Sequence, residues 1–85
     1  MKLYSENIDK FIGQTVKINI NHKIYGKQRA TVCSFQPFYS EEKIGFVIND
    51  REFYMYSYEI ENIEADKKTI YIKGTMQDVV ISVSK

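Results

Sequence analysis

Short runs in which apolar and polar side chains alternate are the feature that most constrains the fold of this chain. The clearest run covers residues 15–21, where Val16, Ile18 and Ile20 alternate with polar residues. A period of two places these three side chains on one face of a half-buried strand. Further strands at a spacing of roughly ten residues are predicted over 30–35, 44–48, 53–58, 70–73 and 79–83. This pattern predicts a mainly β fold, a small antiparallel barrel of five or six strands.

The N-terminal segment has the period of a helix instead. Ser5 is a suitable N-cap and Gly13 a suitable C-cap, and the residues between them include three apolar side chains on one helical face: Ile8, Phe11 and Ile12. We therefore expect a short helix over residues 5–12. So short a helix is not stable alone, so its apolar side must cover the sheet or barrel.

The connections between the predicted strands are short and polar. Pro37 should end the second strand, residues 38–43 should form a loop, and residues 49–52 a hairpin turn. Residues 59–63 form either one helical turn or a continuation of the fourth strand. Because no linker, repeat or low-complexity stretch is present, we expect one domain over 1–85, with the helix at 5–12 and the strands within 15–84.

Composition excludes several classes of protein. The chain has 85 residues, a net charge of +1 and a single cysteine, Cys33. It has no apolar run near the ~20 residues of a membrane helix and no apolar signal-peptide core, so we expect no membrane partner. One cysteine cannot form an internal disulfide, which favours a cytoplasmic protein. Cys33 alternates onto the face of Phe35, and we expect it to be packed in the core.

The sequence gives no pattern for catalysis. His22 is the only histidine, and it lies in a predicted turn where we expect it to be exposed to solvent. One histidine and one cysteine cannot form a zinc site, and a Cys/His pair lacks the third, orienting group. No glycine-rich phosphate loop is present, since the four glycines are scattered. We therefore expect no enzyme, no cofactor and no metal.

Two segments at the ends of the predicted barrel resemble a known family. Residues 12–18 follow a short helix, and residues 70–74 end a strand in Lys73 and Gly74 before the apolar residues 79–81. This arrangement is similar to Sm-like and related SH3-like barrels, in which a glycine bends the chain between the last strands. The resemblance implies a barrel and RNA binding. Residues 35–37 lack the acid and the asparagine of that family's uridine pocket.

The order of charges is more informative than their sum. Residues 14–40 carry four basic residues and no acid, residues 41–66 carry eight acids and two bases, and residues 67–85 carry four bases and one acid. In an SH3-like or Sm-like barrel the first strand pairs with both the second and the last. The two basic segments should then share one side, opposite the acidic middle.

The basic side is a candidate nucleic-acid surface, formed by Lys17, Lys23, Lys27, Arg29 and Lys73. The alternative is that these side chains only keep a small barrel soluble and protect its edges. Ten lysines against two arginines favour this alternative, because arginine is the usual residue for reading bases and binding phosphate with both donors.

A tyrosine row is the second candidate surface. In an extended strand Tyr54, Tyr56 and Tyr58 share one face, while Phe53 and Met55 point into the core. Four acidic residues surround the row in the sequence: Glu52 before it, and Glu59, Glu61 and Glu64 after it. Tyrosine is enriched at protein interfaces, and carboxylates repel a phosphate backbone, so this face favours a protein partner. The alternative is that the rings are buried under the N-terminal helix or the loop at residues 38–39.

These features lead to one leading hypothesis and two alternatives. The leading hypothesis is a non-enzymatic interaction module that binds a protein partner through an acidic, tyrosine-rich strand, an inhibitor or adaptor of the kind that phages and mobile elements encode. The first alternative is an Sm-like barrel that binds RNA or single-stranded DNA through the basic hairpin. The second is self-assembly into a homo-oligomer through exposed strand edges.

Overall fold

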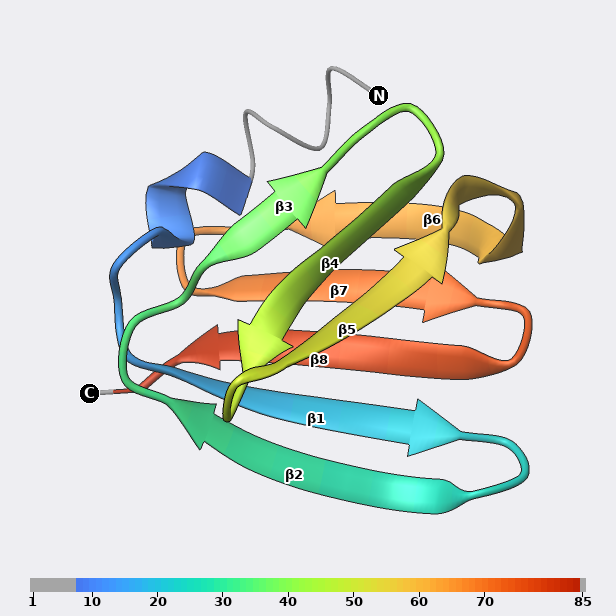
Figure 1. Ribbon diagram of the computed structural model, residues 1–85, viewed down its shortest axis with the longest axis horizontal. Helices are drawn as coiled ribbons and strands as arrows, with labels where there is room; N and C mark the ends of the chain where they lie inside the picture. Colours follow the sequence, from blue (N-terminus) through green and yellow to red (C-terminus); the bar gives the residue numbers. More distant parts are fainter. Residues whose placement is uncertain (1–7, 85) are drawn as a thin grey trace.

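Two antiparallel sheets form the fold in the computed structural model, which describes residues 8–84 (Figure 1). The larger sheet has the strand order β2-β1-β8-β7-β6, and the smaller one has the order β3-β4-β5. The elements, in chain order, are the 3-10 turn η1 (Asp9–Phe11), β1 (Val16–His22), β2 (Gly26–Val32), β3 (Pro37–Tyr39), β4 (Lys43–Ile48), β5 (Arg51–Tyr56), the 3-10 turn η2 (Ser57–Glu59), β6 (Ile60–Ala65), β7 (Thr69–Gly74) and β8 (Gln77–Val83).

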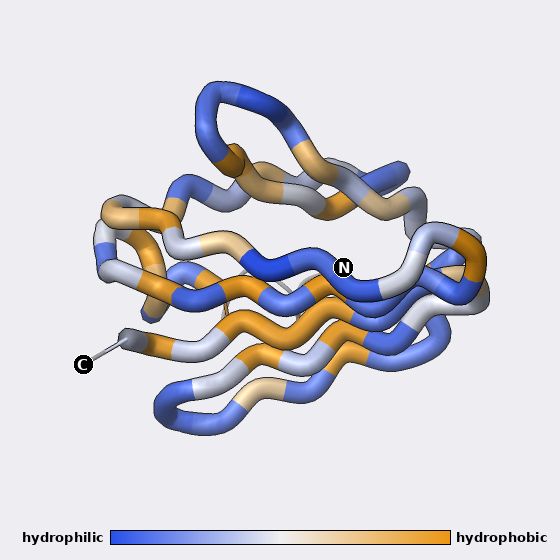
Figure 2. The backbone as a smooth tube through the Cα atoms, turned by 90° about the horizontal axis from the view of Figure 1, so that it is seen from below, coloured by the Kyte–Doolittle hydropathy of each residue, from blue (hydrophilic) through white to orange (hydrophobic). Residues whose placement is uncertain are grey.

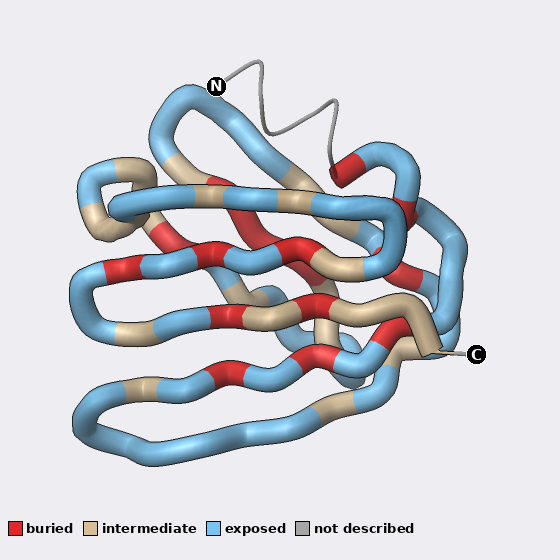
Figure 3. Tube along the Cα trace, turned by 180° about the vertical axis from the view of Figure 1, so that it is seen from behind, coloured by how far each residue is buried: buried red, intermediate tan, exposed pale blue. Residues whose placement is uncertain are grey.

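The first strand lies between the second and the last strand of the chain in the larger sheet. Ile18 of β1 is opposite Ala30 of β2 on one side and Ile81 of β8 on the other. The expectation that the first strand pairs with both the second and the last is therefore confirmed. Buried and exposed residues alternate along β1, β7 and β8, as Figure 3 shows from behind. One face of the larger sheet is thus packed and the other open.

The smaller sheet is built on a tight hairpin. Asn49 and Asp50 join β4 to β5, and both have positive φ, 49° and 67°. A two-residue turn with positive φ at both positions matches the twist of the flanking strands and suits these residue types. The hairpin crosses the larger sheet diagonally, so its tip comes down near β1 and β2 (Figure 1).

The core lies between the two sheets. Ile44, Phe46 and Met55 of the smaller sheet are buried, and they belong to the same cluster as the inward residues of β1, β7 and β8: Val16, Ile18, Ile20, Ile70, Ile72, Val79 and Ile81. The ring of Phe46 lies 5.8 Å from that of Phe35 and 5.1 Å from that of Phe53, centroid to centroid. Figure 2 shows the apolar residues spaced along the strands.

The fold is mainly β, as predicted, but it is not a closed barrel. The smaller sheet pairs only within itself, because η2 carries the chain from β5 over to β6 at the far edge of the larger sheet. The described residues also contain eight strands rather than five or six. Part of the predicted loop at 38–43 pairs in β3. Residues 59–63, expected as a helical turn or a continuation of the fourth strand, instead belong mostly to the separate strand β6. Pro37 begins β3 at a sheet edge, where its missing N–H breaks no ladder.

The predicted N-terminal helix is wrong where the structure tests it. Residues 5–7, with the proposed cap Ser5, lie outside the described residues. Ile8 has α-helical backbone angles, but η1 after it is a single 3-10 turn, and the chain becomes extended at Ile12, which is 54% exposed. Gly13 (φ +80°) donates its N–H to the Phe35 carbonyl, 3.0 Å away, so tertiary pairing replaces the next helical turn. Ile8 and Phe11 are buried, as the apolar stripe required.

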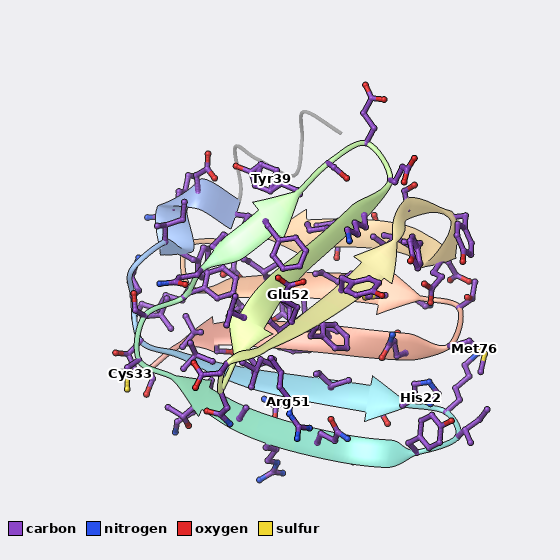
Figure 4. The ribbon with its side chains drawn as sticks, in the orientation of Figure 1. His22, Cys33, Tyr39, Arg51, Glu52 and Met76 are labelled. Carbon is purple, nitrogen blue, oxygen red and sulfur yellow. The ribbon has the colours of Figure 1, made fainter. Side chains whose placement is uncertain are left out.

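The contact between η1 and the smaller sheet is polar as well as apolar. The Tyr39 hydroxyl of β3 donates a hydrogen bond to the Asp9 carboxylate, and this bond raises the pKa of Tyr39. Tyr39 points toward η1 in Figure 4. The contact therefore attaches the N-terminal turn to the smaller sheet.

The second strand begins and ends earlier than predicted. It covers Gly26–Val32, and the chain bends after Val32 before Phe35 enters the core. Because β2 ends at Val32, the alternation of inward and outward side chains does not reach Cys33, and Cys33 is exposed. The core prediction for Cys33 is wrong for this reason.

The outer face of the smaller sheet depends on a glycine. Gly45 is buried, and a Cβ at this position would lie 2.7 Å from the Tyr54 Cβ, 2.8 Å from the Phe38 Cζ and against the Phe53 carbonyl oxygen. The absence of a side chain therefore allows the Phe38 ring to lie beside Tyr54 across β4.

We predict that Gly45→Ala destabilises the protein by about 2 kcal/mol or more, because the backbone of β5 cannot move away without breaking its pairing. Urea unfolding followed by circular dichroism measures this. Thr31→Ala, at an exposed position of β2, is the control and should change stability by less than about 0.5 kcal/mol. Equal stability of Gly45→Ala and the wild type would contradict the account.

Candidate interaction surfaces

The three predicted tyrosines form a row of rings in contact. Tyr54 and Tyr56 project from the outer face of β5, and Tyr58 follows in η2. The Tyr54 and Tyr56 rings meet edge to face with centroids 5.3 Å apart, and the Tyr56 and Tyr58 rings stack at 5.5 Å. Tyr54 is 40% exposed and Tyr58 82%. Tyr56 between them is half-buried. The alternative in which the rings are buried is therefore wrong for Tyr54 and Tyr58.

Two residues that the sequence analysis missed extend this row. The Lys43 Nζ lies 4.5 Å from the centroid of Tyr54 and 5.9 Å from that of Phe38, close enough to attract both rings. Phe38 and Lys43 were placed in a predicted loop, but β3–β4 pairing puts Phe38 opposite Gly45, the partner of Tyr54. We define the tyrosine face as Phe38, Lys43, Tyr54, Tyr56 and Tyr58.

The hydroxyl groups of the row interact as well as the rings. A hydrogen bond from the Tyr56 hydroxyl to Tyr54 raises the pKa of Tyr56, and the charges of its neighbours, including the Glu42 carboxylate, raise it further. Contacts between the rings and the Lys43 cation thus hold the tyrosine face together.

Of the three glutamates that follow the row, Glu59 lies beside it, whereas Glu61 and Glu64 lie on β6 in the larger sheet. The Glu59 carboxylate accepts the Tyr56 backbone N–H at 3.1 Å and so serves to fix η2. Glu61 lies at the irregularity in the pairing of β6 with β7, and Glu64 is opposite Tyr71 on the outer face of the larger sheet. The alternation of β6 and its bulge separate these residues.

Other acids also lie near the tyrosine face. Glu52 has the same outward parity as Tyr54 on β5 and is labelled in Figure 4. The Ser57 N–H donates to the Glu42 carbonyl at 2.7 Å, which brings the 41–42 turn beside η2. The predicted acidic character of this region is therefore supplied by Glu42, Glu52 and Glu59 rather than by Glu61 and Glu64.

Four of the five predicted basic residues share the outer face of the larger sheet. Cross-strand partners lie on the same face of a sheet. On the β1–β2 side, Lys17 is opposite Thr31 and Asn19 is opposite Arg29. Asn21 is opposite Lys27 of β2 and Asp78 of β8. Asp78 is in turn opposite Lys73 of β7. Lys23 lies beyond the sheet, in the turn between β1 and β2. We define the basic face as Lys17, Lys27, Arg29 and Lys73.

The same surface also carries an aromatic ring and two acids. Tyr71 is 45% exposed on β7, between Val80 of β8 and Glu64 of β6. Two shallow hollows of about 330 and 350 Å³ lie on either side of Asp78 and Val80. The charge of this face is thus mixed, because Asp78 and Glu64 lie among the four cations.

A larger cleft opens between the two sheets. It measures about 730 Å³ and lies where the tip of the β4–β5 hairpin faces β1 and β2. Its apolar lining comes from both sheets, from Ile18, Ile20, Ala30, Ile48 and Phe53. Gln28, Asn49, Arg51 and Glu52 are among the polar residues that complete it.

His22 has a structural role in this fold. It is the last residue of β1 and is half-buried rather than freely exposed. Its Nδ1 accepts the backbone N–H groups of Ile24 at 3.0 Å and Tyr25 at 3.2 Å, which closes the β1–β2 turn. Cys33 lies at the opposite end of β2 (Figure 4). Within residues 8–84 no three side chains of the metal-binding types come together.

Comparison with known proteins does not assign this chain to a family. No family model matches this chain, and neither the curated proteins nor the solved structures contain a match. None of the helical segments within residues 8–84 has the length and apolarity needed to cross a bilayer. The function must therefore be argued from the surfaces themselves.

We predict that Tyr54→Phe lowers the pKa of Tyr56 toward the ordinary value of about 10, because the variant lacks the hydroxyl that accepts the Tyr56 proton. A pH titration by NMR of the tyrosine ¹³Cζ signals measures this. Since the folded state raises this pKa, the stabilisation is present below pH about 10 and is lost as the pH rises through the folded-state pKa. Tyr25→Phe removes a hydroxyl from the β1–β2 turn and is the control. An unchanged Tyr56 pKa in Tyr54→Phe would contradict the hydrogen bond.

Proposed function

We propose that this chain is a small non-enzymatic interaction module that binds a protein partner through the tyrosine face. The observation that carries this proposal is the row of three tyrosine rings in contact on β5 and η2, of which Tyr54 and Tyr58 are exposed and Tyr56 is half-buried. A cytoplasmic setting fits the proposal, because the one cysteine of the chain is an exposed, free thiol.

The tyrosine rings already hold fixed positions in the free protein, and this favours binding. Tyrosine offers a large contact area with few rotatable bonds, so it loses little conformational freedom when a partner covers it. Here Tyr56 stacks on Tyr58 at an interplanar angle of 11°, and Lys43 lies over Tyr54. These side chains therefore lose less conformational entropy on binding than freely rotating side chains would.

The charges near the tyrosine face favour a basic partner. Glu42 and Glu59 lie beside Tyr56, and Glu52 shares the outward parity of Tyr54 on β5. Carboxylates would repel a phosphate backbone and attract a positively charged protein surface. A basic groove that normally holds nucleic acid would suit such a face. This is the chemistry expected of a small inhibitor or adaptor of the phage and mobile-element type.

We predict that Tyr58→Ala weakens partner binding by about 30-fold, the size of a hot-spot residue, because the variant lacks the most exposed ring of the row. The experiment immobilises wild-type and variant chains and quantifies the proteins retained from an extract of the source cells. Tyr25→Ala is a matched control, since Tyr25 is 78% exposed and lies in the β1–β2 turn.

The proposal is supported if the wild type and Tyr25→Ala retain a protein that Tyr58→Ala does not retain. Equal retention by the two variants would contradict it, as would retention that disappears with salt alone. Urea unfolding of each variant should show unchanged stability, since the Tyr58 ring is 82% exposed and stacks on Tyr56 at the surface.

Nucleic-acid binding by the basic face is the second candidate function. The observation that favours it is the register that brings Lys17, Lys27, Arg29 and Lys73 to one side of the sheet with Tyr71. An exposed ring beside cations is the arrangement on which single-stranded bases stack. Asp78 and Glu64 on the same face weigh against it, and we therefore rank it below the tyrosine face.

If this second function operates, labelled single-stranded RNA or DNA should bind at low salt with an affinity that falls steeply as salt is added. Fluorescence anisotropy measures this. Arg29→Ala should reduce the slope of log affinity against log salt by about 0.7, the value for one phosphate contact to a single strand. Lys67→Ala, in the β6–β7 turn, is the control. No binding at low salt, or a response that does not depend on salt, would exclude this function.

A further inference from the structure

The outer edge of β2 is open for pairing. β2 is the terminal strand of the larger sheet, and no strand within residues 8–84 pairs with its outer side (Figure 1). Alternate residues of an edge strand direct their backbone N–H and C=O groups away from the sheet. The seven residues of β2 therefore offer a row of unused backbone donors and acceptors.

This edge carries the charged residues Lys27 and Arg29 but lacks the bulge or proline found at the edges β6 and β3. The pairing of β2 with β1 runs through seven consecutive residue pairs with no bulge, and the strand contains no proline. By contrast, β6 has an irregular register at Glu61, and β3 begins at Pro37. Bulges and prolines are common devices that prevent strand addition. Their absence from β2 leaves it competent to accept another strand.

The cleft of about 730 Å³ lies directly inside this edge. Gln28 has the same parity as Ile20, its partner across the ladder, and so faces the inner side, yet it is exposed. Ala30, Ile48 and Phe53 are only half-buried where they line the cleft. The smaller sheet therefore leaves the inner side of β2 partly uncovered, with apolar surface that an added strand would cover.

The side chains on the two sides of β2 define what can pair with it. On the outer side are Lys27 and Arg29, which are both exposed, and on the inner side is the cleft, whose apolar lining residues include Ala30, Ile48 and Phe53 beside polar ones. Neighbouring strands place directly opposed side chains about 4.5–5.5 Å apart. A complementary segment therefore has carboxylates at every second position and apolar side chains between them.

A second copy of this chain does not meet that requirement. If β2 paired with β2 of another copy, the Lys27 and Arg29 side chains of both copies would crowd onto one face. Like charges on adjacent strands destabilise pairing. The charge of β2 thus favours a different protein that supplies an acidic strand.

We propose that β2 binds an extended segment of a partner protein, with alternating acidic and apolar residues, as a sixth strand of the larger sheet. Main-chain hydrogen bonds supply affinity, and the two sets of side chains supply specificity. This site is separate from the tyrosine face, so it stands or falls independently of the function proposed above.

The test uses a fluorescent, capped octapeptide of alternating glutamate and valine. An isomer in which the four valines are contiguous has the same composition and charge but cannot place them all on one side. Anisotropy at moderate salt should show that the alternating peptide binds at least about 10-fold more tightly than the isomer, since only it matches the period of a strand. Hydrogen exchange should show new protection at alternate amides of β2 and no change in β6.

Arg29→Glu should weaken binding of the alternating peptide by at least about 10-fold, because it replaces an attraction by a repulsion. Lys67→Glu makes the same change of charge in the β6–β7 turn and should change the affinity less than about 2-fold. Urea unfolding checks that both variants are folded.

Each of four results would overturn the proposal. These are equal binding of the two peptides, which indicates charge attraction only; no binding of the alternating peptide up to millimolar concentration; protection at β6 instead of β2; and a dimer of the free protein whose β2 amides are already protected, which indicates that a second copy is the occupant.

Discussion

The packing of a five-stranded sheet against a three-stranded one determines the rest of this structure. Inward side chains from β1, β7 and β8 meet Ile44, Phe46 and Met55, and this shared apolar layer is the core of the molecule. The two sheets differ in width, so their inner faces cannot cover each other completely. The uncovered part lies at β2, where Ala30 and Gln28 border an open cleft.

The same alternation that builds the core leaves the outward positions of both sheets available for binding. On the smaller sheet these positions carry Tyr54 and Tyr56, with Phe38 admitted across β4 by the absence of a side chain at Gly45. On the larger sheet they carry cations, Tyr71 and two acids. The two outer faces therefore differ in chemistry, with contiguous aromatic rings on one and mixed charges on the other.

Local alternation was enough to predict most of the strands and the exposed side of the tyrosine row. It identified β1, β4, β5, β7 and β8, and it placed Met55 inward and Tyr54 outward. It could not show that η2 transfers the chain to a second sheet, because that transfer depends on long-range pairing. For the same reason Glu59, Glu61 and Glu64 were assigned to one surface, whereas a cap, a bulge and a change of sheet separate them. Cys33 was misplaced because the alternation was extended past the true end of β2.

The central claim is that the tyrosine face is a binding surface that the fold itself does not need. The most direct measurement places photoreactive benzoylphenylalanine at residue 58 or at residue 25 and irradiates the source cells. Both positions are highly exposed, but only residue 58 belongs to the tyrosine face. The account predicts a discrete protein adduct from position 58 that is absent from position 25. The same adducts from both positions, or an adduct from position 58 with nucleic acid alone, would contradict it.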